Sequence, residues 1–460
     1  MARAKKETAL TPEERLQAAL VPDLEWPYKL PENWCWTRIG MVSNFERGIT
    51  FPAAAKEAAP TEDNIPCLRT ANVQENLEID DMIYVNRDFM KGNIAKLVRE
   101  NDIIMSSANS RELVGKSSLV THIPFPMTFG GFVLNIRAKE MSSKYLFYFL
   151  RHEFLAGKFI GESSQTTNIA NINTTTLGNY EIPLPPLPEQ QRIVDCIESL
   201  FAKLDEAKEK AQAVVDSFET RKAAILHKAF TGELTAKWRE EHGVRMDSWE
   251  VRTLDSVCSS IFDGDHMPPP KAESGIPFLV ISNVNTGHLT FENTRFVPQE
   301  YYDTLSDTRK PQLGDVLYTL VGSFGIPVVV NSKRPFCFQR HMALLRPIDV
   351  SPQFLWYILQ TPEMYDKVSS IATGIAQLTV PIKGLRAMTI PRPNIAEQVE
   401  IVRILDGFFA REQSAKEAAE AVLDQINLMK KSILARAFRG ELGTNDPSEE
   451  SAVELLKQII

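Results

Sequence analysis

The clearest pattern in the chain is a heptad spacing of apolar residues that occurs twice. Apolar residues recur at alternating steps of four and three, which is typical of a helix that packs along one seam. The first seam consists of Ile193, Ile197, Leu200, Leu204, Ala207, Ala211, Val214, Phe218 and Ile225, with an interruption at Arg221. The second consists of Ile401, Leu405, Phe408, Ala415, Ala419, Val422, Ile426, Met429 and Ile433, with an interruption at Glu412. The pattern predicts two long helices that pack seam to seam.

The residues around these stretches predict where each helix begins and ends. Pro188 suits a first helical turn, and Asn394 followed by Glu397 is typical of an N-cap and its N3 partner. Gly232 and Gly440 stand where the heptad spacing stops, as glycine often does just after a helix. Each helix would be roughly 60 Å long at 1.5 Å per residue.

The two helical stretches belong to a longer internal repeat. The segment Ile182–Leu234 aligns without a gap with Ile390–Leu442, at an offset of 208 residues. Upstream, IPCLRTANV (65–73) resembles IPFLVISNV (276–284), and VLNIRAKEMSSKYLFYFL (133–150) resembles MALLRPIDVSPQFLWYIL (342–359). The chain therefore has two similar halves, each a region of mixed pattern followed by a long helix.

The regions before the helices have the patterns of α/β structure. Short β-branched runs bounded by Gly, Pro or Asn, such as DIIMS, SSLVTHI, GIPFLVI, GDVLYTLVG and IPVVVN, predict strands. The segments SKYLFYFLRHEFLAGKF and PQFLWYILQTPEMYDKV are spaced like amphipathic helices, whose aromatic residues we interpret as core.

The predicted fold class is mixed α/β, with two similar globular domains separated by two long antiparallel coiled-coil helices in a pseudo-twofold repeat. The expected segments are an N-terminal arm (1–24), a first domain (25–180), a first helical spacer (181–234), a linker (235–248), a second domain (249–388), a second spacer (389–442) and a C-terminal tail (443–460). We expect the arm and the tail to pack together.

Composition places the chain among soluble globular proteins. Its 460 residues are 43% hydrophobic and 24% charged, which suggests two to four domains. No segment resembles a signal peptide or a membrane span, and five scattered cysteines favour neither disulfides nor zinc. We therefore expect a cytoplasmic protein. The net charge of −8 argues mildly against nucleic-acid binding, although the run Ser332–Pro347 is basic and has no acid.

Several of these motifs resemble the specificity subunits of type I restriction–modification systems. They include the helix entries NYEIPLPPLPEQ and AMTIPRPNIAEQ, GDVLYTLVGSFGIPVVV in the second domain, LPENWCWTRIGMVS at the start of the first, and TPEERLQAALVP near the N-terminus. The resemblance covers essentially the whole chain. The first domain departs from the pattern at SSANSRELVGKSSLV, where VGSFG has no close counterpart.

This resemblance implies a non-catalytic DNA-binding subunit. Each domain would be a target recognition domain that reads one half of a bipartite site in double-stranded DNA, and the helices would set the gap between the halves. The implied partners are two methyltransferase subunits that methylate adenine at N6, with two ATP-dependent restriction subunits as an optional addition. The chain itself would bind no cofactor, because S-adenosylmethionine, ATP and Mg²⁺ belong to the partners.

The search for built-in chemistry supports a binding role. The chain has no N/D-P-P-Y/F tetrapeptide of an adenine methyltransferase, no phosphate-binding loop, and no histidine spacing typical of a metal site. A fused methyltransferase is thereby disfavoured. The main alternative is a two-headed coiled-coil scaffold that binds proteins rather than DNA, which would also account for the acidic charge.

The candidate DNA-contacting residues are cations for phosphates and polar side chains for base edges. In the first domain they are Arg69, Asn72, Lys91, Lys96, Arg111, Lys116, Gln165, Thr166, Thr167 and Asn168; in the second they are Gly322, Ser323, Lys333, Arg334, Gln339, Arg340, His341 and Gln377. Asn72 and Asn283 hold matching repeat positions, so a shared structural turn is an equally good interpretation there. A solvated hairpin is the alternative for the run that contains Lys333.

Overall fold

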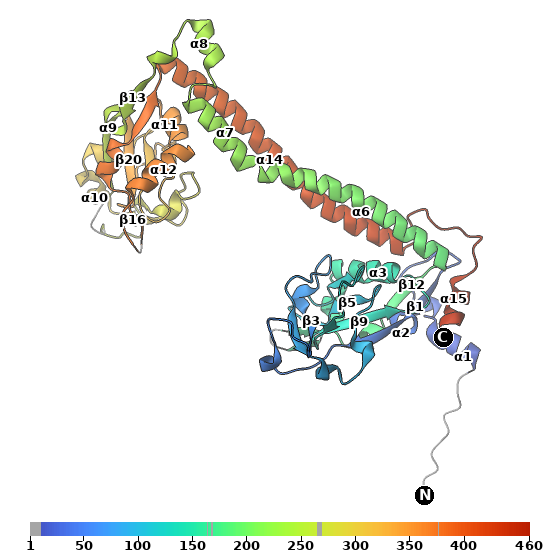
Figure 1. Cartoon of the computed structure of the whole chain (residues 1–460). Helices are drawn as coiled ribbons and strands as arrows, with labels where there is room; N and C mark the ends of the chain where they lie inside the picture. The colour runs from blue at the N-terminus through green and yellow to red at the C-terminus, as the bar shows by residue number, and fades with distance from the viewer. Residues whose placement is uncertain (1–10, 163, 167–168, 265–268, 376) are drawn as a thin grey trace. The chain divides into compact units, whose positions relative to one another are not determined.

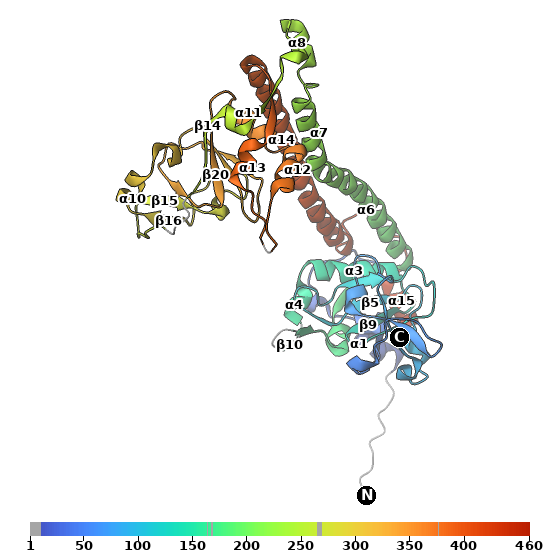
Figure 2. The same ribbon diagram turned by 60° about the vertical axis from the view of Figure 1, so that its left-hand side comes forward.

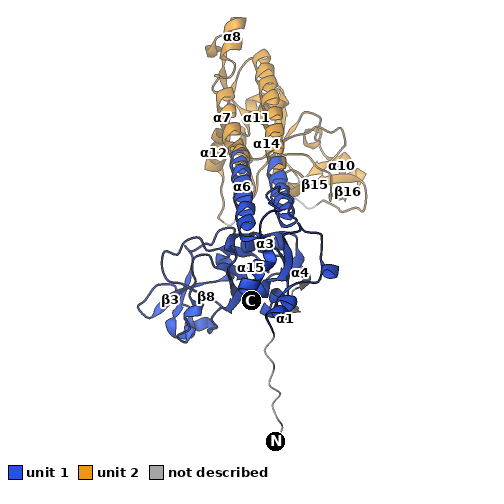
Figure 3. Cartoon of the chain, turned by 90° about the vertical axis from the view of Figure 1, so that its right-hand side faces the viewer, with its two compact units in different colours: residues 1–210, 422–460 blue, residues 211–421 orange. Residues whose placement is uncertain are grey.

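The computed structural model describes residues 11–162, 164–166, 169–264, 269–375 and 377–460. The chain divides into two compact units (Figure 3): unit 1 is Met1–Lys210 with Val422–Ile460, and unit 2 is Ala211–Ala421. The boundaries fall within the two long helical segments, so each unit holds one part of each. The units therefore differ from the two halves of the sequence repeat, because the end of the chain joins its beginning.

Unit 1 is a mixed α/β structure (Figure 1). Its strands are β1 (Cys35–Arg38), β2 (Ser43–Arg47), β3 (Asn64–Leu68), β4 (Ile83–Asn86), β5 (Ile103–Ser106), β6 (Ala108–Asn109), β7 (Ser117–Leu119), β8 (Thr128–Phe129), β9 (Val133–Ala138), β10 (Ser164–Thr166), β11 (Ile169–Asn171) and β12 (Glu181–Leu184). Its helices are α1 (Pro12–Ala19), α2 (Ile39–Val42), α3 (Ser143–Leu155), α4 (Lys158–Glu162), α5 (Thr174–Gly178) and α15 (Ala452–Ile459), with parts of α6 (Leu187–Asp216) and α14 (Ile395–Phe438).

Unit 2 repeats this organisation. Its strands are β13 (Glu250–Thr253), β14 (Cys258–Asp263), β15 (Ile276–Leu279), β16 (Arg295–Val297), β17 (Val316–Thr319), β18 (Pro327–Val329), β19 (Cys337–Phe338), β20 (Met342–Pro347) and β21 (Thr389–Arg392). Its helices are α7 (Phe218–Phe230), α8 (Ala236–His242), α9 (Leu254–Val257), α10 (Gln299–Thr304), α11 (Pro352–Ile358), α12 (Pro362–Ile371) and α13 (Ile382–Ala387), with the remaining parts of α6 and α14.

Three sheets of unit 1 correspond strand by strand to sheets of unit 2, and the sheet β10-β11-β6 of unit 1 has no such counterpart among the described residues. The antiparallel sheet β2-β9-β5-β7 matches β14-β20-β17-β18, the sheet β4-β3-β8 matches β16-β15-β19, and the pair β1-β12 matches β13-β21. A buried ion pair recurs in the four-stranded sheets: Arg137 Nε lies 2.7 Å from Asp102 Oδ1, and Arg346 Nε lies 3.0 Å from Asp315 Oδ1. The predicted internal repeat of α/β regions is confirmed.

The largest core of each unit includes residues of both the α/β region and the long helices. In unit 1, Tyr145 of α3 packs edge-on against Phe438 of α14, with ring centroids 5.4 Å apart. In unit 2, Phe354 of α11 packs in the same way against Phe230 of α7 at 5.3 Å, and α11 lies beside α7 in both views (Figures 1 and 2). These aromatic residues are core, as the sequence predicts.

The long helices end where the glycines predict. Gly232 and Gly440 adopt left-handed φ values of 85° and 72°, which glycine reaches without a steric cost. The second helix is continuous over 44 residues. The first is interrupted at Ser217, between α6 and α7, which the heptad spacing did not predict.

The predicted cap of α14 is half right. Asn394 accepts a hydrogen bond from the backbone N–H of Glu397 at 2.9 Å, as an N-cap does. The Glu397 carboxylate does not complete a capping box. It is fully buried and accepts hydrogen bonds from Thr235, Arg239 and Trp249.

The arm and the tail pack together in unit 1, as expected. Arg15 of α1 donates to the terminal carbonyl of Ile460 at 3.1 Å. Further along, Trp34 Nε1 donates to Asn445 Oδ1 at 3.2 Å, and the Ala452 N–H donates to the Asn33 carbonyl at 2.9 Å. The last segment of the chain therefore completes the first unit. Among the described residues, no helix has both the length and the apolar character needed to cross a bilayer.

Candidate nucleic-acid interface

In unit 2, three of the candidate segments meet at the end of β17. The Leu320 N–H donates to the His341 carbonyl at 2.7 Å, and the Leu320 carbonyl accepts from the Val380 N–H at 2.8 Å. These two bonds bring together the loop after β17, the turn before β20 and the segment that precedes α13. The Gly322 N–H also donates to the Leu378 carbonyl at 3.1 Å, which closes the cluster.

The same two bonds hold the corresponding segments of unit 1. The Ser107 N–H donates to the Phe132 carbonyl at 3.0 Å, and the Ser107 carbonyl accepts from the Ile172 N–H at 2.9 Å. Here the third segment is the hairpin β10–β11, and β11 pairs with β6 in register Ala170↔Asn109. Each unit therefore presents a cluster of three loops built on one backbone pattern, which we call the loop cluster.

The missing counterpart of VGSFG in the first domain is the loop 107–115. The Gly115 N–H donates to the Ser106 carbonyl at 2.8 Å, and the Gly325 N–H donates to the Thr319 carbonyl at 3.0 Å. Both glycines have left-handed φ values, 86° and 89°. The first loop is three residues longer, and this insertion hides the match in the sequence.

Several predicted contact residues lie exposed in the loop clusters. They are Arg111 in unit 1 and Gly322, Ser323, Arg340 and Gln377 in unit 2. Arg111 and Arg340 have no carboxylate partner among the described residues, so both guanidinium groups are available to a ligand. Gln339 and His341 flank Arg340 and are half-buried. Burial, with the nearby Arg340 charge, lowers the pKa of His341, so this side chain is neutral at pH 7.

The predicted contact residue Asn72 and its repeat counterpart Asn283 both hold structural turns. Asn72 is 2% exposed, and its amide accepts from Arg69 N–H and donates to the carbonyls of Glu78 and Asp81. Asn283 makes the equivalent bonds to Val280 and Glu292. Both asparagines therefore hold the same structural turn, which agrees with the shared-turn interpretation, while a DNA contact at Asn72 stays a prediction.

Three predicted cations already have partners. Arg69 pairs with Asp81 at 3.0 Å, and Lys96 pairs with Glu46. Lys116 donates to Gln74 Oε1 at 2.7 Å, and burial lowers its pKa. These cations support loops of unit 1, although Arg69 also lines a groove with Gly131 and Phe132 beside the loop cluster.

The remaining candidates lie elsewhere or outside the described part of the chain. Lys333 and Arg334 follow β18 at the end opposite to Gly322, and Arg334 stacks over Phe291 at 4.9 Å. Lys91 is exposed in a left-handed turn after Met90. Gln165 and Thr166 lie in β10, for which only the backbone is described, while Thr167 and Asn168 fall outside the described residues.

Some exposed residues in these regions were not predicted. Phe132 in the turn of unit 1 is 65% exposed, and Ile375 in unit 2 is fully exposed. Lys56 lines the same groove as Arg69 and is exposed. The paired glycines of FGGF (129–132), which precede Phe132, are the sequence feature that could have indicated this exposed turn. The sequence alone did not distinguish it from an ordinary turn.

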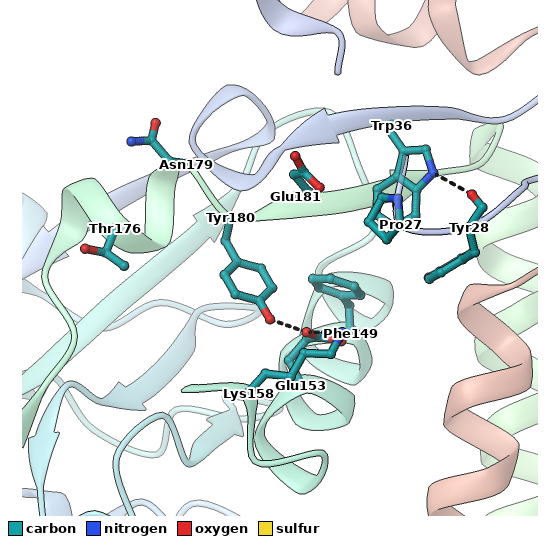
Figure 4. A pocket seen from close by; sticks show the side chains of 10 residues that line it. All are labelled: Pro27, Tyr28, Trp36, Phe149, Glu153, Lys158, Thr176, Asn179, Tyr180 and Glu181. Atoms are coloured by element: carbon teal, nitrogen blue, oxygen red, sulfur yellow. Dashed lines mark hydrogen bonds and ion pairs between the residues drawn. The ribbon is translucent and has the colours of Figure 1, made fainter. Parts of the chain in front are cut away.

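A separate hollow in unit 1 lies among β1, α3, α4 and α5 (Figure 4). Its lining residues are Pro27, Tyr28, Trp36, Phe149, Glu153, Lys158, Thr176, Asn179, Tyr180 and Glu181. Glu153, which is 2% exposed, accepts from the Tyr180 hydroxyl and lies 3.0 Å from Lys158 Nζ. The buried Glu153 carboxylate therefore has partners within the hollow, and the hollow contains none of the candidate contact residues. The described residues contain no group of His, Cys, Asp or Glu side chains that could hold a metal ion.

Comparison with known proteins identifies the family. The profile described as "Type I restriction modification DNA specificity domain" matches residues 31–215 and 246–423, one match for each half of the repeat. The chain belongs to this family. It is 28% identical over 455 residues to the specificity subunit of the type I restriction enzyme EcoKI from Escherichia coli K12, which covers 94% of this chain and 96% of that protein. It is also 25% identical to the StySPI specificity subunit of Salmonella potsdam, over 90% of each chain.

Solved structures of this family share the fold. The HsdS subunit from Thermoanaerobacter tengcongensis has a TM-score of 0.60 at 22% identity, covering 91% of this chain and all of that one. A chain from a structure described as "Structural basis underlying complex assembly and conformational transition of the type I R-M system" has a TM-score of 0.68 at 22% identity, over 90% of this chain and all of that one. The predicted resemblance and fold class are therefore confirmed, and the chain is a type I specificity subunit.

Proposed function

We propose that this specificity subunit reads a bipartite site in double-stranded DNA, with one loop cluster for each half-site. The observation that carries this proposal is the repeated backbone pattern at Ser107 and Leu320. The loop cluster of each unit also carries an exposed arginine, Arg111 in the loop 107–115 of unit 1 and Arg340 in the turn before β20 of unit 2. Arginine is the residue that most often reads guanine in the major groove. Two similar readers in one chain fit two half-sites in one DNA molecule.

The helices would set the gap between the half-sites. The second helix alone is 44 residues long, or about 66 Å at 1.5 Å per residue. Its first part belongs to unit 2 and its last part to unit 1. A continuous helix that contributes to both units is a suitable element for fixing a distance.

The expected partners supply the chemistry that this chain lacks. Two methyltransferase subunits would bring S-adenosylmethionine and methylate adenine at N6 within the site. Restriction subunits, where a host encodes them, would bring ATP and Mg²⁺ and cut DNA. This chain would bind none of these cofactors itself.

Methylome sequencing tests the proposal. The host is compared with and without this gene, with its methyltransferase gene present in both. We expect a bipartite N6-methyladenine motif that disappears when the gene is deleted and returns when it is supplied again. An active methyltransferase whose methylation pattern is unchanged by the deletion would overturn the proposal.

The alternative is a two-headed scaffold for protein partners, which the net charge of −8 favours. The two functions differ in a mobility shift with purified methyltransferase. A specificity subunit gives a shift only for DNA that carries both half-sites, whereas a scaffold gives none that depends on sequence.

A further inference from the structure

The long helices are joined across their seam by an ion pair in unit 2. Arg221 Nε lies 2.7 Å from Glu412 Oε2, and Arg221 also donates to the Val214 carbonyl at 3.2 Å. The two charged side chains are 34% and 19% exposed. They stand at the two positions where the apolar heptad spacing is interrupted, so each interruption is the partner of the other.

A different ion pair joins the helices in unit 1. Lys430 Nζ lies 2.5 Å from Asp205 Oδ1 and 5.0 Å from the centroid of the Phe201 ring. The Lys430 side chain is 11% exposed. Its charge is therefore placed against an aromatic face and the carboxylates of Asp205 and Glu75, the second at 3.9 Å, rather than in open solvent.

Both pairs fit one antiparallel register. From Asp205 to Arg221 the first helix advances 16 residues, and from Lys430 to Glu412 the second goes back 18 residues. The separations along the two helices differ by two residues, so both pairs are consistent with nearly the same antiparallel register.

Neither pair is repeated at the equivalent place in the other unit. With the repeat offset of 208 residues, Arg221 corresponds to Met429 and Glu412 to Leu204. Lys430 corresponds to the cation Lys222, but Asp205 corresponds to Gln413, which carries no charge, so the second pair lacks its carboxylate there. The charges thus break the symmetry of an otherwise symmetric seam.

This asymmetry disfavours other pairings. If the first helix paired with the same helix of a second chain, Arg221 would face Leu204. If two second helices paired, Glu412 would face Met429. A slip of one heptad would place Arg221 opposite Leu405 or Ala419. Each alternative leaves a half-buried charge without a partner, which is costly.

We infer that the Arg221–Glu412 pair, with Lys430–Asp205 in support, fixes which helices pair and in which register, and thereby determines the recognised gap. This inference rests on the proposed function, because only a subunit that reads two half-sites has a gap to fix. A slip of one heptad would change the helix overlap by about 10 Å, or about 3 bp of DNA.

The test replaces the pair in three ways. Glu412→Arg places two cations opposite each other, and the exchange Arg221→Glu with Glu412→Arg restores opposite charges. Arg221→Met with Glu412→Leu makes the seam apolar, a replacement that commonly preserves folding. The matched control is Arg403→Glu with Glu400→Arg, an exchange of a pair within the same helix that does not cross the seam and in which Arg403 is 69% exposed.

Two readouts follow each variant: the mass of the purified chain in solution, and the gap distribution in the methylome. We expect the apolar variant and Glu412→Arg to form dimers or to methylate sites whose gap is shifted by about 3 bp. The charge exchange and the control should give the wild-type mass and a single gap.

A monomeric apolar variant with one unchanged gap would overturn the inference. So would a charge exchange that behaves like Glu412→Arg alone. Failure of the proposed function is a separate result, because the wild-type gene would then give no bipartite motif, while the solution mass would still report on helix pairing.

Discussion

The buried carboxylate of Glu397 gives the sharpest prediction about stability. It is fully buried at the start of α14, and Arg239 of α8 is the cation that neutralises it, with Nη1 2.6 Å from Oε1. The Thr235 hydroxyl and the Trp249 N–H donate to the same carboxylate at 2.7 and 2.8 Å. Arg239→Met would leave a buried negative charge without its cation.

The expected cost is about 3–5 kcal/mol of the unfolding free energy of unit 2, the usual effect of breaking a buried ion pair from one side. For a unit of this size, about 1 kcal/mol corresponds to roughly 2–4 °C in Tm, so the transition should fall by about 6–20 °C. Adding Glu397→Leu removes the stranded charge and should recover more than half of the loss.

Scanning calorimetry of the full chain measures the transition, and hydrogen exchange of residues 211–421 assigns it to unit 2. Arg403→Met is the control, because Arg403 is 69% exposed and the loss of its ion pair with Glu400 should leave the transition unchanged. A shift for Arg239→Met no larger than that of the control would refute the reasoning. A double variant less stable than Arg239→Met would refute it as well.

Other expectations concern pH, recognition and the tail. Burial lowers the pKa of His152, which stacks on Phe438. The unfolded chain therefore binds the proton more readily than the folded chain, and unit 1 should lose stability as pH falls through about 6.5. His152→Gln should weaken this pH dependence in thermal melts. Arg111→Ala and Arg340→Ala should each relax methylation specificity at a different half-site, and relaxation of the same half-site by both would contradict one reader per unit. Deletion of 445–460 should lower the Tm of unit 1, measured by calorimetry, but leave unit 2 unchanged. DNA binding by the isolated chain should be weak, with a shallow dependence on salt in titrations.

Much of the fold can be predicted from this sequence because its signals are local and repeated. The heptad spacing identifies both long helices, and the aligned segments around Ile65 and Ile276 identify the two α/β regions. The break at Ser217 was missed because the apolar spacing continues through it. The role of Glu397 was missed because its partner Arg239 is 158 residues away in the sequence, and a local capping box is the simpler interpretation.

The loop clusters are harder to predict because backbone bonds assemble them. Ser107 and Leu320 have unlike side chains, yet their N–H and C=O groups make the same two bonds. The candidate segments of unit 2 were found from glycine and polar residues. The matching loop of unit 1 was obscured, because three extra residues separate its glycine, Gly115, from the register of the repeat.

Charge is the property that composition describes least well here. A count of cations treats Arg69, Lys96 and Lys116 as available, whereas each is engaged with a neighbour within unit 1. In the basic run of unit 2, Arg346 is committed to the buried Asp315. The cations left for phosphates are therefore fewer than the sequence suggests. A chain with a net charge of −8, several of whose candidate cations are engaged, should release few counterions when it binds DNA. This is the physical reason to expect a shallow salt dependence and to assign most phosphate neutralisation to partner subunits.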